Sequence, residues 1–196
     1  CKAKITYCYY NKEKKLVPRN GYPKVIEPLT MMWSNGYYYL LAYQEKYQSI
    51  IHYRVDRITD IEKLEQKTSQ KMRDFDLVRY RNEHPVMFAG EKEHFMLLCR
   101  DNGKNFIVNT IMDVFGRNCI IESADDRILK ENLGHDRKFY EECGEEWILV
   151  RFASTAGGVE MWATQYCENC IIISPEHSRM AVKKRLEKGR ENYERG

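Results

Sequence analysis

The sequence lacks the features that would assign it to a membrane protein or a secreted protein. No apolar run approaches the roughly 20 residues that cross a bilayer, and the first residues, CKAKITYCYY, contain no apolar signal-peptide segment. Seven cysteines are an odd number, and in a chain without an export signal they indicate reduced thiols. We therefore expect a cytoplasmic protein without a membrane partner.

Patterns for catalysis, metals and cofactors are missing as well. The CENC motif at 167–170 has no second cysteine pair at a suitable spacing, so buried or incidental cysteines are favoured over a zinc or redox site. The stretch TAGGVE at 155–160 lacks the spacing and the lysine of a phosphate loop, so a close approach of a helix to a sheet explains its glycines better. No nucleophile–base set follows from spacing. The sequence thus predicts neither an enzyme, nor a metal, nor a cofactor.

The charge is unevenly distributed along the chain. Residues 1–57 contain 10 Lys and Arg against 4 Asp and Glu, a net charge of +6, whereas residues 58–196 contain 22 against 25, a net charge of −3. An anionic partner is therefore expected at the N-terminal third. Because the chain begins with Cys1 rather than Met, we expect it to be a fragment that lacks its N-terminal part.

Short strands are predicted over residues 4–61. Aromatic and β-branched residues dominate, turn signals such as Asn35-Gly36 recur about every ten residues, and the segments KITYCYY, KVIEPLTMMW, YYYLLAY and IIHYRVDRI read as strands. This pattern is typical of a small β-barrel. The aromatic stripes in it are interpreted mainly as core.

The remaining chain reads as a linker followed by an α/β module. Residues 63–93 are charge-rich and interrupted by His84-Pro85, and residues 94–196 alternate strands and helices in the order β-α-β-β-α-β with one further helix. That order is typical of a ferredoxin-like module. The predicted fold is α+β: a barrel at 1–62, a linker at 63–93 and the module at 94–196, with the role of residues 124–146 left open.

The strand IIHYRVDRI at 50–58 is the most unusual stretch. Its alternation places His52, Arg54 and Asp56 on one side, and Ile51, Tyr53 and Val55 on the other. Arg57 then falls on the apolar side, where it could reach the mouth of a pocket or be paired inside the fold.

These segments resemble the WYL domain of bacterial transcriptional regulators. The triplet Tyr38-Tyr39-Leu40 stands where the family has Trp-Tyr-Leu, and HYRVDRI matches the family strand R-x-F-R-x-D-R-I at its last Arg-x-Asp-Arg-Ile. Ile51 replaces the first Arg of that pattern, and Tyr53 replaces the Phe. VIEPL at 25–29 resembles the family strand that ends in Glu-Pro-Leu, and the region after the linker resembles the family's C-terminal extension.

The resemblance implies an Sm-like or SH3-like barrel that senses a ligand, often a nucleotide or a single-stranded nucleic acid. It also implies a DNA-binding region upstream, which these residues do not contain. We expect ligand contacts from Arg54, Arg57, His52, Tyr39 and Tyr9, because outward cations beside aromatic rings suit a phosphate or a stacked base. The alternative for the two arginines is an ion pair with Asp56 or Asp60 that stabilises the strand end.

Two functions remain open at this level. The first is the ligand-sensing and dimerisation region of a bacterial transcriptional regulator, which binds an anionic nucleotide-like or nucleic-acid effector on the barrel. The second is a single-stranded nucleic-acid-binding module without a regulatory role. A homodimer is expected because the strands HFMLLCR and EWILVRF are too apolar to leave a broad sheet face open to water.

Overall fold

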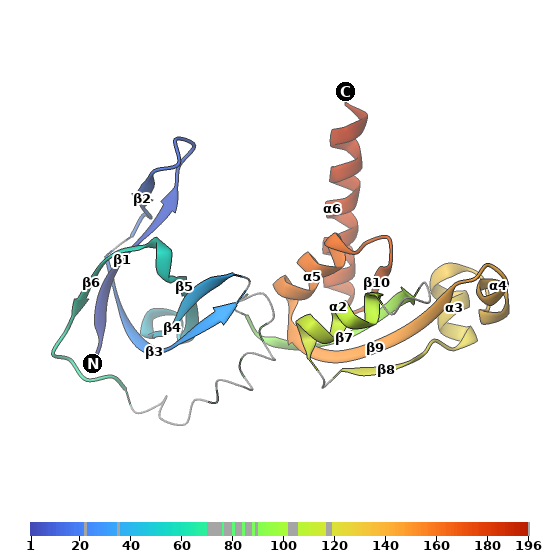
Figure 1. Cartoon of the computed structure of the whole chain (residues 1–196), viewed down its shortest axis with the longest axis horizontal. Helices are drawn as coiled ribbons and strands as arrows, with labels where there is room; N and C mark the ends of the chain where they lie inside the picture. Colours follow the sequence, from blue (N-terminus) through green and yellow to red (C-terminus); the bar gives the residue numbers. More distant parts are fainter. Residues whose placement is uncertain are drawn as a thin grey trace. The chain divides into compact units, whose positions relative to one another are not determined.

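The structure is a computed structural model, and it describes residues 1–21, 23–34, 36–69, 76, 80, 84, 88, 90–101, 106–116 and 119–195. The chain divides into two compact units, Cys1–Leu77 and Val78–Gly196 (Figure 1). The first unit is a curled antiparallel sheet, and the second is another antiparallel sheet with helices. The predicted α+β class is therefore confirmed, while much of the predicted linker lies outside the described residues.

The N-terminal unit is built from strands that are joined by short connections. The strands are β1 (Ala3–Tyr10), β2 (Leu16–Pro18), β3 (Lys24–Ser34), β4 (Tyr37–Gln44), β5 (Ser49–Arg54) and β6 (Ile58–Lys63). The sheet has the order β2-β1-β3-β4-β5, and β6 pairs with β1 rather than with the preceding β5. Because β6 returns to β1 in this way, the sheet curls toward a barrel (Figure 1).

The core of this unit is formed by one face of the curled sheet. Its buried members are Ala3, Ile5, Tyr7, Ile26, Ala42 and Tyr53. Not all aromatic residues lie in it: Tyr7, Tyr43 and Tyr53 are buried, but the side chains of Trp33 and Tyr38 are more than half exposed. The interpretation of the aromatic stripes as core is thus wrong at the β3–β4 hairpin. The two rings project from its surface and contact each other edge to face, with centroids 4.8 Å apart.

The stretch IIHYRVDRI is not one strand. β5 ends at Arg54, a 3-10 turn covers Val55–Arg57, and β6 begins at Ile58. The chain must turn here because β6 pairs with β1, so the alternation of side chains stops at Arg54. Val55 is exposed, and Arg57 lies in the turn. The prediction that both side chains point inward from one continuous strand is therefore wrong.

The C-terminal unit has the strand order of a ferredoxin-like fold. Its elements are β7 (Lys92–Asp101), α2 (Phe106–Phe115), β8 (Ile120–Ser123), α3 (Asp126–Leu133), α4 (Arg137–Glu142), β9 (Glu146–Thr155), α5 (Ala156–Gln165), β10 (Cys170–Ser174) and α6 (Glu176–Glu194). The sheet order is β10-β7-β9-β8, with all neighbours antiparallel. Numbered within the unit, this is the order 4-1-3-2 that the predicted β-α-β-β-α-β succession requires.

Both faces of this sheet carry helices. One face packs on α2 and α5 through a core that includes Leu97, Val150 and Trp162. The other face packs on α3 and α4 through Leu98, Leu149 and residues such as Leu129 and Tyr140. The expectation of a broad open apolar face is therefore wrong, because residues 124–146 form the helices α3 and α4, which cover this face.

Two capping signals explain these additional helices. The Asp125 side chain accepts a hydrogen bond from the Ile128 backbone N–H at the start of α3, and Asp136 does the same for Phe139 at the start of α4. Gly134, with φ +91°, ends α3 in the left-handed conformation that favours glycine. These signals are present in the sequence and could have located both helices.

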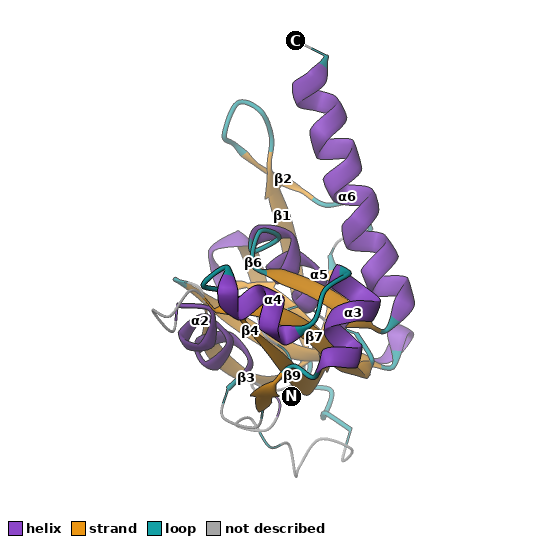
Figure 2. Ribbon diagram, turned by 90° about the vertical axis from the view of Figure 1, so that its right-hand side faces the viewer, coloured by secondary structure: helices purple, strands orange, loops and turns teal. Residues whose placement is uncertain are grey.

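The last helix, α6, extends past its own sheet. Its first half is anchored by the buried residues Ser178 and Val182, but Leu186 is 39% exposed and Tyr193 is 91% exposed. Figure 2 shows the C-terminal part of α6 projecting beyond the strands of its unit. The helix face that carries Val182, Leu186 and Tyr193 is therefore buried only at its N-terminal end.

Candidate anion-binding site

Arg54 lies at the end of β5 between an aromatic ring and a carboxylate. Its guanidinium carbon is 3.3 Å from the centroid of the Tyr37 ring. Its Nε and Nη2 atoms donate to the two oxygens of Asp56 at 3.0 and 2.7 Å. The ion pair that the sequence allowed as an alternative is therefore present, and it leaves Nη1 of Arg54 outside the bidentate contact.

The electrostatics of this pair keep both partners charged. The hydrogen bond to Asp56 raises the pKa of Arg54. In return, the hydrogen bond from Arg54 lowers the pKa of Asp56. A guanidinium that is stacked on a ring and held by a carboxylate is fixed in one orientation before any ligand arrives.

Arg57 lies in the turn that follows, beside Tyr7. Its Nε atom is buried, and no acceptor reaches it within the described part of the chain. Burial raises the pKa of the Tyr7 hydroxyl, against the opposing effects of the Arg54 backbone N–H, which donates to it at 3.4 Å, and of the Arg57 guanidinium. A buried guanidinium N–H without an acceptor is costly, and an anion or a water molecule at this position would satisfy it.

The remaining predicted residues lie around these arginines in different ways. Tyr39 is directly opposite Arg54 in the β4–β5 ladder, so their side chains share one face of the sheet. Tyr9 contacts Tyr7 edge to face at 6.2 Å and carries Arg19 over its ring at 5.0 Å. The structure thus connects Tyr9, through Tyr7, to the turn that holds Arg57.

His52 does not stand on an open surface. It shares a face with Arg54, as predicted, but it is only partly exposed and lies directly opposite the buried Leu41. His52 and Arg54 therefore lie together on the face that points away from the core of this unit, as predicted, but this face is partly covered, since Leu41 and Tyr43 on it are buried. A ligand role of His52 stays a prediction.

Two residues of this site were not among the predicted contacts. Tyr37 provides the ring under Arg54, and Tyr7 joins the two arginines through its hydroxyl. Both could have been found in the sequence. Tyr37 points to the same side of its strand as Tyr39, and Tyr7 points to the same side of its strand as Tyr9. We call Tyr7, Tyr37, Arg54 and Arg57 the arginine–tyrosine site.

The site brings together two kinds of group at the end of β5. The curled β-sheet carries the guanidinium groups of Arg54 and Arg57 beside tyrosine rings, a combination that can hold an anion next to a flat group. The WYL domain family matches residues 2–63, so this part of the N-terminal unit is a WYL domain. The predicted resemblance is confirmed.

Two solved structures are similar to the chain. One is proteasome accessory factor B/C (PafBC) of Arthrobacter aurescens, with 16% identity and a TM-score of 0.34 over 95% of this chain and 24% of that chain. The other is a CRISPR Cas-related protein, with 15% identity and a TM-score of 0.48 over 98% of this chain and 48% of that chain. The chain thus spans about a quarter and about half of the length of these two structures. No curated protein matches it.

The CENC motif contributes no metal site within the described ranges. Cys167 is exposed, whereas Cys170 is buried and lies opposite Cys99 in the β7–β10 ladder. No group of three or more His, Cys, Asp or Glu residues is placed to hold a metal ion in that part of the chain. None of the described helices has the length and apolar character that crossing a bilayer requires.

Proposed function

We propose that the chain is the ligand-sensing and dimerising region of a bacterial transcriptional regulator, and that its WYL domain binds an anionic, nucleotide-like effector at the arginine–tyrosine site. The match to the WYL domain over residues 2–63 supports a regulatory sensing role. The positive charge of the N-terminal third favours an anionic effector over a neutral one.

One observation carries the proposal: the buried Nε–H of Arg57 has no acceptor in the described part of the chain. Buried donors in folded proteins are nearly always paired, so an anionic acceptor that reached this N–H would gain a hydrogen bond that the protein itself does not make. The neighbouring Arg54 provides a second guanidinium, and Tyr37 and Tyr39 lie on its face of the sheet. A phosphate at the arginines with a base against a tyrosine ring matches these groups.

Replacing Arg54 with Gln is expected to weaken binding of a nucleoside monophosphate or a short oligonucleotide by about 1–3 kcal/mol, the range of a lost charge-assisted contact. Arg57→Gln should have an effect of the same size. Fluorescence anisotropy or calorimetry with a panel of mononucleotides and oligonucleotides measures both. Lys12→Gln is the matched control, because it removes the same charge from a side chain that is 92% exposed.

Asp56→Asn distinguishes binding from a purely structural ion pair. It removes the partner of Arg54 but keeps the guanidinium, so affinity should fall less than in Arg54→Gln. Equal melting temperatures and unchanged affinity in Arg54→Gln, Arg57→Gln and Asp56→Asn would contradict the proposal. A steep salt dependence that grows with oligonucleotide length would instead favour the alternative, a single-stranded nucleic-acid-binding module.

The C-terminal unit is the proposed site of homodimerisation. Its exposed large apolar side chains include Ile120 on the edge strand β8 and Met180 on α6, which are 58% and 50% exposed. Edge strands and exposed apolar residues are common at interfaces between copies of a chain.

Light scattering of the whole chain should give twice the mass of one 23.4 kDa chain. Ile120→Lys should shift the population toward monomer, because a lysine ammonium would have to be desolvated at the interface. Lys138→Gln, at an exposed position of α4, is the control and should leave the mass unchanged. A chain that remains monomeric at high micromolar concentration would remove the dimerisation role.

A further inference from the structure

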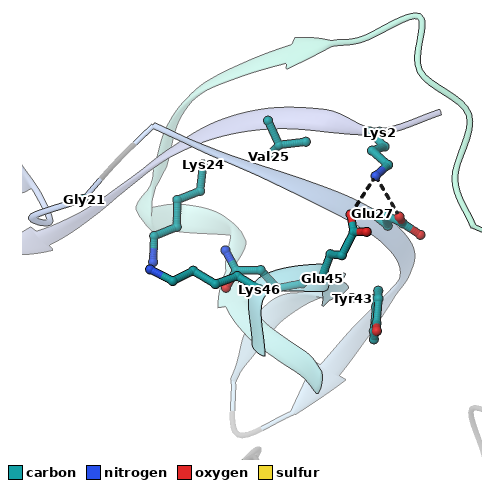
Figure 3. Close-up of a pocket in the computed structure, with 9 residues that line it drawn as sticks. Lys2, Gly21, Lys24, Val25, Glu27, Tyr43, Glu45 and Lys46 are labelled. Carbon is teal, nitrogen blue, oxygen red and sulfur yellow. Dashed lines mark hydrogen bonds and ion pairs between the residues drawn. The ribbon is translucent and has the colours of Figure 1, made fainter. Parts of the chain in front are cut away.

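A cavity of the WYL domain lies away from the arginine–tyrosine site. It has a volume of about 330 Å³, near the lower end of the range for small-molecule sites. Its wall comes from the start of β1, the start of β3 and the connection between β4 and β5, and its lining includes Lys2, Lys24, Glu27, Gln44 and Lys46. Figure 3 shows the side chains of Lys24 and Lys46 on one side of it, and Lys2 with Glu27 and Glu45 on the other.

The Lys24 side of the cavity is positively charged. The Nζ of Lys24 donates to the Tyr47 hydroxyl at 3.4 Å, and the ammonium groups of Lys24 and Lys46 lie 5.3 and 5.7 Å from the centroid of the Tyr47 ring. The hydrogen bond from Lys24, with the attraction of Lys24 and Lys46, lowers the pKa of the Tyr47 hydroxyl. Two ammonium groups that converge on one ring create a local field that attracts an anion.

The opposite side of the cavity carries one ammonium and two carboxylates, a net charge of −1, against +2 from Lys24 and Lys46. The Lys2 ammonium lies 3.2 Å from a carboxylate oxygen of Glu27 and 3.2 Å from one of Glu45. Glu27 also accepts hydrogen bonds from the backbone N–H and the hydroxyl of Ser69. Both carboxylates therefore already contact the Lys2 ammonium, and Glu27 also contacts Ser69. This ion-pair network lies next to the positive side of the cavity.

A buried glutamine contributes its amide to the wall of the cavity. Gln44 is only 4% exposed, and it lines the cavity. The amide atoms of Gln44 are not among the buried polar atoms that lack a partner. An amide in the wall of a cavity can both donate to and accept from a bound molecule.

We propose that this cavity binds a small dianion, a phosphomonoester of the size of a sugar phosphate, with its phosphate between Lys24 and Lys46 and a hydroxyl group at the amide of Gln44. Such a phosphate carries a charge near −2 at neutral pH and suits two lysine ammonium groups, which act as point charges toward phosphate oxygens. Its polar body suits an amide that can both donate and accept.

This site is separate from the arginine–tyrosine site. Gln44 pairs with Ser49 at the first residue of β5, whereas Arg54 is its last residue. Five residues of strand separate the two positions by about 17 Å. The two sites can therefore be tested by different variants, and neither depends on the other.

The test is a titration of the whole chain with ribose 5-phosphate, with inorganic phosphate and ribose as separate probes, followed by heteronuclear NMR. Lys46→Gln and Lys24→Gln should each weaken ribose 5-phosphate binding at least about tenfold, the effect of removing a hydrogen bond to a charged group. Gln44→Met should weaken ribose 5-phosphate more than inorganic phosphate, because only the sugar reaches the amide. Lys46 is exposed, so its variant tests binding without a risk to folding.

A second measurement reports on the same site. Saturation with ribose 5-phosphate should raise the pKa of Tyr47, since the bound negative charge offsets the attraction of the two lysines for the phenolate. Tyr47→Phe identifies the resonance that shifts. If inorganic phosphate binds as tightly as ribose 5-phosphate, the cavity recognises the phosphate dianion, and the sugar adds nothing to the affinity. No chemical-shift change at millimolar probe, or an equal loss in Lys12→Gln, would overturn the proposal.

Discussion

Replacing Glu160 with Ala should lower the free energy of unfolding of the C-terminal unit by about 2–4 kcal/mol, the range for breaking a buried, hydrogen-bonded carboxylate network. Glu160 is 8% exposed in the middle of α5. It accepts from the Ser178 hydroxyl at 3.0 Å and from the Arg185 guanidinium at 2.8 Å, both of α6. Since Ser178 is fully buried, its hydroxyl loses its acceptor in the variant.

Denaturant unfolding monitored by the fluorescence of Trp162, which lies in the same core, measures this loss. The matched control is Glu187→Ala, which removes a carboxylate of the same helix pair from an exposed contact with Lys183 at 4.0 Å. Exposed ion pairs of this kind contribute only about 0–0.5 kcal/mol. Equal losses in both variants would show that the network does not hold α6 against α5.

Replacing Glu27 with Ala should lower the free energy of unfolding of the WYL domain by about 2–4 kcal/mol, because Lys2 and Ser69 then lose a buried acceptor. Glu27 is 3% exposed in β3. Burial by itself raises the pKa of Glu27, but hydrogen bonds from Ser69 and the hydrogen bond and attraction of Lys2 outweigh it and hold the pKa below its usual value of 4.5.

This depressed pKa predicts a dependence of stability on pH. A carboxylate with a lower pKa in the folded state than in the unfolded state stabilises the fold above the unfolded value. Its contribution is therefore present above about pH 4.5 and is lost as pH falls through the folded pKa. Melting temperatures of wild type and Glu27→Gln between pH 3 and 7 test this on the whole chain. The two should differ at pH 7 and converge toward pH 3, and a constant difference would contradict the assigned ionisation.

The fold was predictable from the sequence where local patterns decide it. Strand alternation and turn residues located β1, β3, β4 and β5, and the β-α-β-β-α-β order indicated the ferredoxin-like module. The helices α3 and α4 were missed although Asp125 and Asp136 cap them, because their helical periodicity is interrupted by charges over residues 124–146. As a result, the predicted open face of the second sheet is occupied at Leu98 and Leu149.

The arginine–tyrosine site was predictable only in part. The family motif indicated Arg54 and Arg57, and strand pairing places Tyr39 opposite Arg54. The sequence could not show that Arg57 lies in a turn, since that turn exists only because β6 pairs with β1. It could not show either that Tyr7, 47 residues before Arg54, places its hydroxyl at the Arg54 backbone.

By itself, the sequence determined β1, β3, β4 and β5, the α+β class and the WYL motif, because each of these depends on residues that are neighbours in the chain. The tertiary structure alone decided which charges meet. Lys2, Lys24 and Lys46 come from three separate segments, and only the curling of the sheet brings them around one cavity. The pairing of Arg54 with Asp56 was one of several pairings that the sequence permitted, and the turn after β5 selected it. Contacts between distant segments depend on the closure of the whole sheet, and no local pattern records them.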